Sequence, residues 1–164
     1  MTHEQNIDEN GHVLTGLDAY KIAVSTPSAF IGGTDDARGD KDGSQSAFKL
    51  FTITGDVIVR VFGFCTVSLV GANATLKVGV AGNLAELITQ STGTDIDVND
   101  IWLDATVDDV SADVFGDVKA DTLIMGGADI IETVATADIT AGNIRYVCLW
   151  RPVTIGSKVV GIAS

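Results

Sequence analysis

The stretch AFKLFTITGDVIVRVFGFCTVSLV, residues 47–70, decides the fold class. It is dominated by β-branched and aromatic residues, which are enriched in strands. The TGD triplet at 54–56 interrupts it with residues that are typical of tight turns. We therefore expect two strands, over 47–54 and 56–70, with a turn where they meet.

The second of these strands has apolar residues on both of its faces. Alternation places Val59, Val61 and Cys65 on one face and Phe62 and Phe64 on the other. A strand with one face in water normally carries polar residues on that face. We therefore expect Phe62 and Phe64 to be covered by a second sheet, by the N-terminal segment or by another subunit. The last of these alternatives predicts a homo-oligomer, expected to be a trimer closed by cyclic symmetry.

Further strand patterns follow the opening pair at short intervals. They cover residues 74–80, 101–107, 120–125, 129–136 and 143–153, and turn residues separate them. Many short strands with regular turn signals are typical of a β-sandwich. The sequence therefore predicts an all-β protein with one jelly-roll-like sandwich domain over residues 47–164.

One segment has a helical pattern. In AGNLAELITQS, residues 81–91, Asn83 can cap a helix N-terminus and Glu86 stands three residues later, as in a capping box. Leu84, Leu87 and Ile88 would share one helical face. We expect at most one short helix here, of one or two turns.

Residues 1–46 are polar and glycine-rich, unlike the rest of the chain. The segment AYKIAVS at 19–25 alternates like an edge strand or a docking strand, whereas residues 32–46 contain no large apolar side chain and cannot offset the entropy of ordering themselves. We therefore predict an N-terminal arm with one strand, which packs little on its own domain and gains order from a neighbouring subunit or from a larger assembly that the protein binds. Its expected contact residues are Tyr20, Ile22, Val24, Phe30 and Ile31.

Composition excludes several classes of partner. The formal net charge is −12, and the acids are mostly aspartate, since glutamate occurs only at positions 4, 9, 86 and 132. An acidic chain without a basic stripe repels nucleic acid and anionic membranes, so we expect neither as a partner. The N-terminus has no signal-peptide pattern and no apolar run reaches transmembrane length, so we expect a protein made in a cytoplasm.

The residues needed for catalysis are not brought together by any motif. His3 and His12 lie in the polar tail, and no serine or cysteine stands in a nucleophile motif. Glu86 and Glu132 are the glutamates available for a glycosidase pair, but a helix cap and a solvent-facing strand position explain them equally well. We expect no enzyme activity, no catalytic residue and no cofactor.

Two acidic segments leave a cation site open as an alternative. DKDG at 40–43 resembles part of an EF-hand loop, but the loop lacks its final glutamate. TDIDVND at 94–100 has acids at alternate positions, which also fits a strand with a polar outer face. We assign no metal site. The Arg-Gly-Asp triplet at 38–40 resembles an adhesion-receptor ligand, but a chance occurrence within the predicted arm explains it better.

The cysteines and tryptophans lie in strand patterns. Cys65 and Cys148 occupy core-facing positions, so we expect two reduced, unpaired thiols rather than a disulfide. Trp150 shares a face with Ile144 and Cys148, which favours the core. Trp102 is left open between a core position and an exposed position where a sugar could stack.

Four stretches together resemble a group of small virion structural proteins of tailed bacteriophages, of the head decoration (cement) type. They are KLFTITGDVIVRVFG (49–63), ATLKVGVAGNLAELI (74–88), DIW (100–102) and YVCLWRP (146–152). The resemblance covers most of residues 47–153 and does not include the N-terminal segment. It implies a protein that binds the outer surface of a capsid, commonly as a trimer, with the major capsid protein as its partner.

The leading hypothesis is therefore a non-enzymatic capsid decoration protein that bridges neighbouring capsid subunits and stabilises the head. It would be located on the outer surface of a virion assembled in the host cytoplasm, where a neighbouring subunit or the capsid would order its N-terminal arm. Two alternatives stay open. One is another virion component, such as a neck, tail or head-fibre subunit. The other is a carbohydrate-binding adhesion module that uses Trp102.

Overall fold

The computed structural model describes residues 6–7, 13–14, 20–44, 46–104, 107–108 and 121–163, with the backbone alone at 6–7, 13–14, 84–86 and 108. Most of these residues lie in strands, and the helical structure among them is one 3-10 turn, Gly93–Asp95. Within the described residues, no helix is long and apolar enough to cross a membrane.

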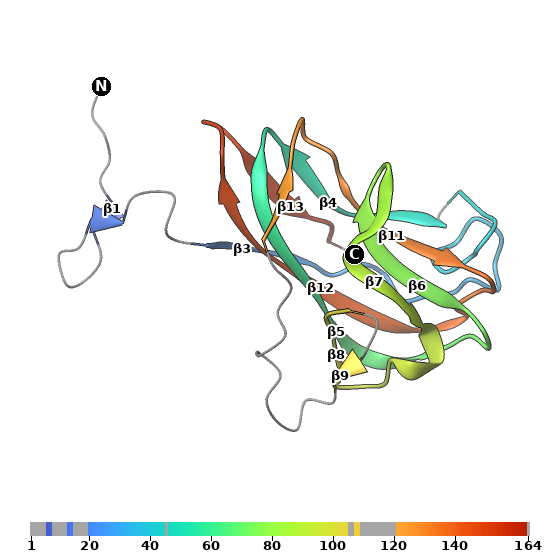
Figure 1. Ribbon diagram of the computed structural model, residues 1–164. Helices are drawn as coiled ribbons and strands as arrows, with labels where there is room; N and C mark the ends of the chain where they lie inside the picture. Colours follow the sequence, from blue (N-terminus) through green and yellow to red (C-terminus); the bar gives the residue numbers. More distant parts are fainter. Residues whose placement is uncertain are drawn as a thin grey trace.

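Two antiparallel sheets pack face to face (Figure 1). The larger sheet has the order β3 (Lys21–Ser25), β12 (Ala141–Pro152), β5 (Val57–Val70), β8 (Ile101–Trp102) and β9 (Val107–Asp108), and β10 (Thr122–Ile124) also pairs with β5. The second sheet has the order β13 (Lys158–Gly161), β4 (Ala47–Thr54), β11 (Ile130–Ala135), β6 (Thr75–Val80) and β7 (Asn83–Thr92). Near the N-terminus, β1 (Asn6–Ile7) pairs with β2 (Val13–Leu14).

The strand order is that of a jelly roll. Eight strands in chain order are β3, β4, β5, β6, β7, β8, β11 and β12. The larger sheet takes the first, eighth, third and sixth of them, and the second sheet takes the second, seventh, fourth and fifth. This crossing between two sheets is the double Greek key of the jelly roll. The predicted all-β, jelly-roll-like sandwich is confirmed.

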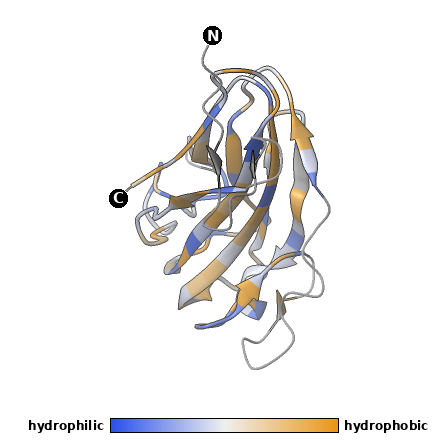
Figure 2. Cartoon of the chain, turned by 90° about the vertical axis from the view of Figure 1, so that its left-hand side faces the viewer, coloured by the Kyte–Doolittle hydropathy of each residue, from blue (hydrophilic) through white to orange (hydrophobic). Residues whose placement is uncertain are grey.

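The core lies between the two sheets and follows the alternation of the sequence. Apolar residues run along strands of both layers and are interrupted by hydrophilic positions (Figure 2). On β5 and β12 the buried side chains alternate with partly exposed ones. The buried apolar and aromatic set on these two strands is Val57, Val59, Val61, Cys65, Leu69, Ile144, Tyr146, Cys148 and Trp150. The second sheet contributes Leu50, Phe51, Leu76, Val78, Ile130 and Val134 from its inner face.

Residues 20–44 belong to this sandwich, so the prediction that residues 1–46 pack little on their own domain is wrong for this part. β3 pairs with β12 from Tyr146 opposite Ser25 to Trp150 opposite Lys21. The Thr26 amide donates to the Ile162 carbonyl at 2.8 Å, which joins the end of β3 to the chain after β13. The strand expected at 19–25 is therefore present, but as an edge strand of its own sheet. Gln45 and residues 1–5, 8–12 and 15–19 lie outside the described residues.

The short helix expected at 81–91 is also wrong, because this segment forms β7. Val80 pairs with Asn83, so Ala81 and Gly82 form a two-residue hairpin turn. Gly82 has a φ of +98°, which suits glycine. A helix of one or two turns is unstable without packing, whereas β7 gains a ladder with β6 and buries Leu87 and Ile88.

Candidate interaction surface

The face of the larger sheet that points away from the second sheet combines apolar side chains with arginines. β12 and β5 form its centre, and β3 flanks β12 (Figure 1). β10 pairs with the start of β5. We call this surface the large-sheet face. It consists of Tyr20, Ile22, Val24, Ile58, Arg60, Phe62, Phe64, Leu123, Arg145, Val147, Leu149 and Arg151.

The strand register arranges these side chains in rows across the sheet. Val24 pairs with Val147, which pairs in turn with Phe62. In the next row, Leu149 lies between Ile22 and Arg60. Directly paired residues on one face are close enough for their side chains to touch. The apolar side chains therefore form a continuous band over three strands.

Several members of the large-sheet face are open to solvent. Ile22 is 69% exposed, Leu123 is 53% exposed and Val24 is 45% exposed. Phe62 and Phe64 are half-buried among their neighbours on the face. Contiguous exposed apolar surfaces are uncommon on monomeric proteins and are typical of interaction sites.

The outer face of the second sheet differs in composition. Its outward-pointing side chains are mostly threonine and lysine, including Lys49, Thr52, Thr75, Lys77 and Thr133. Such a face is suited to water. The two outer faces therefore differ in composition, and the large-sheet face is the more apolar of the two.

One corner of the large-sheet face is organised by Asp121. Its carboxylate accepts a hydrogen bond from the Tyr20 hydroxyl, lies 2.6 Å from Arg60 Nε and lies 2.8 Å from Arg151 Nη2. The two guanidinium groups lie 5.2 and 4.8 Å from the centroid of the Tyr20 ring. The Tyr20 hydrogen bond and Arg60 lower the pKa of Asp121. Arginine side chains are thus held in place on an apolar sheet face.

Arg145 lies at the other end of the same face. Its guanidinium is 5.8 Å from the centroid of the Phe64 ring, and it forms no ion pair with a described residue. Arginine and aromatic residues are the types most enriched in protein interfaces. Three of the four arginines in the chain lie on this face, and the fourth, Arg38, is buried.

The structure brings together five of the seven contact residues predicted from sequence. Tyr20, Ile22, Val24, Phe62 and Phe64 share the large-sheet face, although the first three were assigned to an arm and the last two to the domain.

The other two predicted residues do not belong to this face. Phe30 is 1% exposed and lies in the core, so its prediction as a contact residue is wrong. Ile31 is 55% exposed, but it lies in the loop after β3. Its amide donates to the Arg38 carbonyl at 2.9 Å, so that loop is tied to its own domain.

Sequence reasoning missed the contribution of β12. Val147, Leu149, Arg145 and Arg151 occupy the positions that alternate with the buried Tyr146 and its neighbours. The alternation that placed one set in the core also implied that this second set points outward. The alternation in the sequence therefore indicated that these β12 side chains point outward. Only the strand pairing shows that they lie on the same surface as Phe62.

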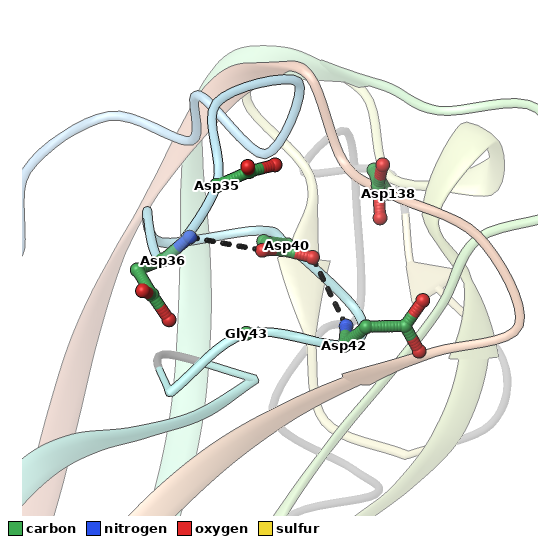
Figure 3. Close-up of a pocket in the computed structure, with 6 residues that line it drawn as sticks. All are labelled: Asp35, Asp36, Asp40, Asp42, Gly43 and Asp138. Atoms are coloured by element: carbon green, nitrogen blue, oxygen red, sulfur yellow. Dashed lines mark hydrogen bonds between the residues drawn. The ribbon is translucent and has the colours of Figure 1, made fainter.

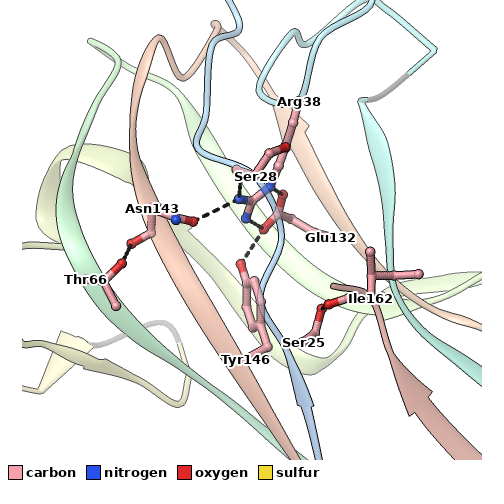
Figure 4. A network of polar contacts seen from close by, with 8 residues as sticks. All are labelled: Ser25, Ser28, Arg38, Thr66, Glu132, Asn143, Tyr146 and Ile162. Carbon is pink, nitrogen blue, oxygen red and sulfur yellow. Dashed lines mark hydrogen bonds and ion pairs between the residues drawn. The ribbon is translucent and has the colours of Figure 1, made fainter. Parts of the chain in front are cut away.

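Arg38 anchors the loop between β3 and β4 in the interior (Figure 4). Arg38 Nε and Nη2 donate to the two carboxylate oxygens of Glu132 at 2.9 and 2.7 Å. Arg38 Nη1 donates to the Ser28 carbonyl and, at 3.2 Å, to Asn143 Oδ1. The Tyr146 hydroxyl donates to Glu132. Every member of this buried network is supplied with a partner, as a buried ion pair requires.

Burial and charge act together on the titration of this network. Burial raises the pKa of Tyr146 well above its usual range, and the neighbouring Glu132 carboxylate raises it further. Burial alone would lower the pKa of Arg38, but Glu132 outweighs this effect, so the pKa is raised. Glu132 is 0% exposed, so the expected solvent-facing position is wrong, and this carboxylate is committed to Arg38 rather than available to a substrate.

The Arg-Gly-Asp triplet has a structural explanation. Arg38 is 3% exposed and stacks on the Phe30 ring at 3.8 Å, so a receptor could not reach it. Gly39 has a φ of +104°, and a Cβ there would lie 2.3 Å from the Ile139 carbonyl oxygen. Asp40 holds the turn that follows. The triplet is therefore part of the fold of its loop.

The acidic loop forms a depression lined by Asp35, Asp36, Asp40, Asp42, Gly43 and Asp138 (Figure 3). Carboxylates of this depression accept hydrogen bonds from backbone amides of the loop. Asp40 accepts the amides of Asp36 and Asp42, each at 3.0 Å, and Asp138 accepts the Lys41 amide at 3.0 Å. The backbone amides of Asp42 and Asp36 lower the pKa of Asp40. These carboxylates organise the loop, as is usual for aspartate in turns.

Metal binding gains no support from either acidic segment. Among the described residues, no group of three or more histidine, cysteine, aspartate or glutamate side chains is arranged to hold a metal ion. The segment 94–100 is not the expected strand, because it begins in the 3-10 turn Gly93–Asp95 and continues in turns. There, Asp100 accepts the Asp97 amide at 2.7 Å.

Trp102 belongs to the core. It is 0% exposed, and its Nε1 donates to Ser91 Oγ at 2.7 Å. Trp150, the other tryptophan, is 6% exposed, as expected. A sugar-stacking platform needs an open aromatic face, so the adhesion alternative loses the residue on which it depended.

The comparisons with known proteins add no relative. The chain matches no family model, no curated protein and no solved structure.

Proposed function

We propose that this protein is a non-enzymatic structural subunit of a tailed-bacteriophage virion, a head decoration protein that binds the outer capsid lattice. The observation that carries the proposal is the large-sheet face, a contiguous apolar surface bearing arginines on a jelly roll, which suits a subunit that works by assembling with copies of itself or with other proteins. A subunit that acts by contact needs such a surface and no catalytic centre. The resemblance of residues 47–153 to virion proteins supplies the biological setting.

The mechanism is stabilisation by mass action. A protein that binds only the assembled shell lowers the free energy of that shell relative to its open or dissociated forms. Binding across the joints between capsid subunits would therefore oppose the pressure of packaged DNA. Self-association would allow one decoration unit to contact several capsid subunits at once, and the resulting avidity can exceed each single affinity.

The proposal is tested on particles of the phage or prophage whose genome encodes the chain. Antibodies against the purified protein, with gold labels, should decorate the head of intact virions in electron micrographs. Labelling of the neck, tail or fibres would favour the alternative virion roles instead. Absence of the protein from purified particles, judged by mass spectrometry, would overturn the proposal.

A further inference from the structure

We propose that the large-sheet face is occupied by a second copy of this chain, packed face to face around a twofold axis that runs parallel to β5 and β12. The inference rests on the proposed function only in treating this face as a protein-contact surface. It does not depend on the identity of the particle.

The argument comes from the distribution of arginines over the two central strands. Arg145 on β12 pairs with Phe64 on β5, and Leu149 on β12 pairs with Arg60 on β5. The end row pairs Arg151 with Ile58. The remaining central row, Val147 with Phe62, is apolar on both strands. Each row therefore holds at most one arginine, always beside an apolar or aromatic residue.

A twofold axis parallel to the strands exploits this pattern. This axis places β12 of one copy over β5 of the other. Each row of residues then faces the same row of the second copy. Arg145 then faces Phe64 of the second copy, and Leu149 faces Arg60 of the second copy. Every arginine meets an apolar or aromatic side chain, where a guanidinium can stack.

A twofold axis in this plane but perpendicular to the strands is unfavourable. An axis perpendicular to the strands lays β12 over β12 and inverts the order of the rows, so that Arg145 faces Arg151 of the second copy. Like charges opposite each other destabilise an interface. A trimer would need a second, different patch on each copy, whereas the large-sheet face is complementary to itself.

The size of the face is sufficient for a specific but weak dimer. Four strands about 4.8 Å apart and seven residues of about 3.4 Å each give a projected area of roughly 450 Å² per copy. Two copies together approach the area of about 1,000 Å² that separates specific interfaces from incidental contacts. We therefore expect self-association that depends on protein concentration.

Single cysteines at the two ends of the face distinguish the arrangements. Arg145→Cys and Ile58→Cys lie in rows six residues apart, or about 20 Å. With the axis parallel to the strands, each variant lies next to its own copy and should be linked to itself by a short bismaleimide. The native thiols of Cys65 and Cys148 are buried, with pKa values raised to about 11 and about 12, and should not react.

We expect each variant alone to give cross-linked dimers. In a mixture, we expect no dimer that links Arg145→Cys to Ile58→Cys. Val160→Cys on the outer face of the second sheet is the matched control and should give no cross-linked dimer, because the two thiols lie far from the interface. Adding Phe62→Asp to Arg145→Cys should abolish its cross-link. Cross-links only in the mixture would indicate the perpendicular axis, and trimers or no cross-links at all would equally overturn the proposal. None of these results bears on whether virions carry the protein.

Discussion

Arg38 shows how a residue in a polar, acidic stretch can belong to the core. Nothing in its local sequence indicates burial, because its neighbours are aspartates and glycines. Its partners, Glu132 and Tyr146, are 94 residues or more away along the chain. Glu132 did carry a signal, since it stands between Ile130 and Val134 at inward-facing positions of one strand. A buried carboxylate in a strand needs a cationic partner. The sequence does not show that Arg38 is this partner of Glu132, because the two residues come together only in the folded chain.

Removing the Arg38 side chain is expected to destabilise the fold strongly. Arg38→Met leaves the Glu132 carboxylate buried without its partner, which costs about 3–5 kcal/mol. The double variant Arg38→Met with Glu132→Leu should recover much of that loss, because both charges are gone. Urea unfolding followed by tryptophan fluorescence measures the difference.

Lys41→Met is the matched control for that experiment. Lys41 forms an ion pair with the exposed Asp42, and such pairs contribute less than about 1 kcal/mol. If Arg38→Met unfolds at the same urea concentration as the Lys41 variant, the network does not anchor the loop.

The two thiols are expected to be unreactive in the native state. They are also expected to make the free energy of unfolding fall at alkaline pH. Burial raises the pKa of Cys65 to about 11 and of Cys148 to about 12. The native state therefore keeps protons that the unfolded state loses above about pH 9, so the free energy of unfolding falls as pH rises through this window. The raised pKa of Tyr146 acts in the same direction.

Thiol titration and alkaline unfolding test this expectation together. Both cysteines are free in the structure, as predicted from sequence. Reagent at neutral pH should find almost no reactive thiol in native protein and two in denatured protein without reductant. Rapid native reaction, or unfolding free energy unchanged between neutral pH and pH about 11, would contradict the burial of these groups.

At the scale of elements, strand positions were predictable and strand partners were less so. The alternation in residues 47–70 and 143–153 correctly placed β4, β5 and β12, because burial on one face imposes a period of two. The pattern at 19–25 predicts β3, but as a strand that docks on another subunit, whereas it pairs with β12 of its own sheet, with Ala23 and Ser25 inward and the larger Ile22 and Val24 outward. Larger side chains outside and smaller ones inside reverse the usual pattern, which is the expected exception at a contact surface.

Local sequence also could not decide which sheet a strand joins. Gly126-Gly127 has the positive φ values of a hairpin turn, yet β10 before it pairs with β5 in the larger sheet and β11 after it lies in the second sheet. The capping-box spacing of Asn83 and Glu86 favours a helix where the structure has β7. A partner strand, β6, outweighs that weak local preference.

Truncation before Ala47 is expected to unfold the protein. It removes β3, which pairs along β12, together with Phe30 from the core and Arg38 from its network with Glu132. A chain that begins at Tyr20 retains all of these contacts and is the matched control. Circular dichroism and thermal unfolding of the two truncations give the comparison. A cooperative thermal transition in the chain that begins at Ala47 would restore the view of an independent arm.

For the whole molecule, the net charge and the large-sheet face have opposite effects on self-association. The chain carries a net charge of −12, while three of its four arginines are gathered on the large-sheet face. Two copies repel at long range even though their apolar faces match. Salt screens that repulsion. We therefore expect added sodium chloride to strengthen self-association in sedimentation velocity experiments. Dissociation by salt would instead indicate an interface held by ion pairs, contrary to the proposed packing.

The central claim is that the large-sheet face holds two copies together, and sedimentation equilibrium tests it most directly. The wild-type mass should rise with concentration from that of the 17.0 kDa chain to that of a dimer. Phe62→Asp should remain monomeric, while Val160→Asp, on the outer face of the second sheet, should follow the wild type. A wild-type chain that stays monomeric at every concentration, or two variants that associate equally well, would contradict the claim.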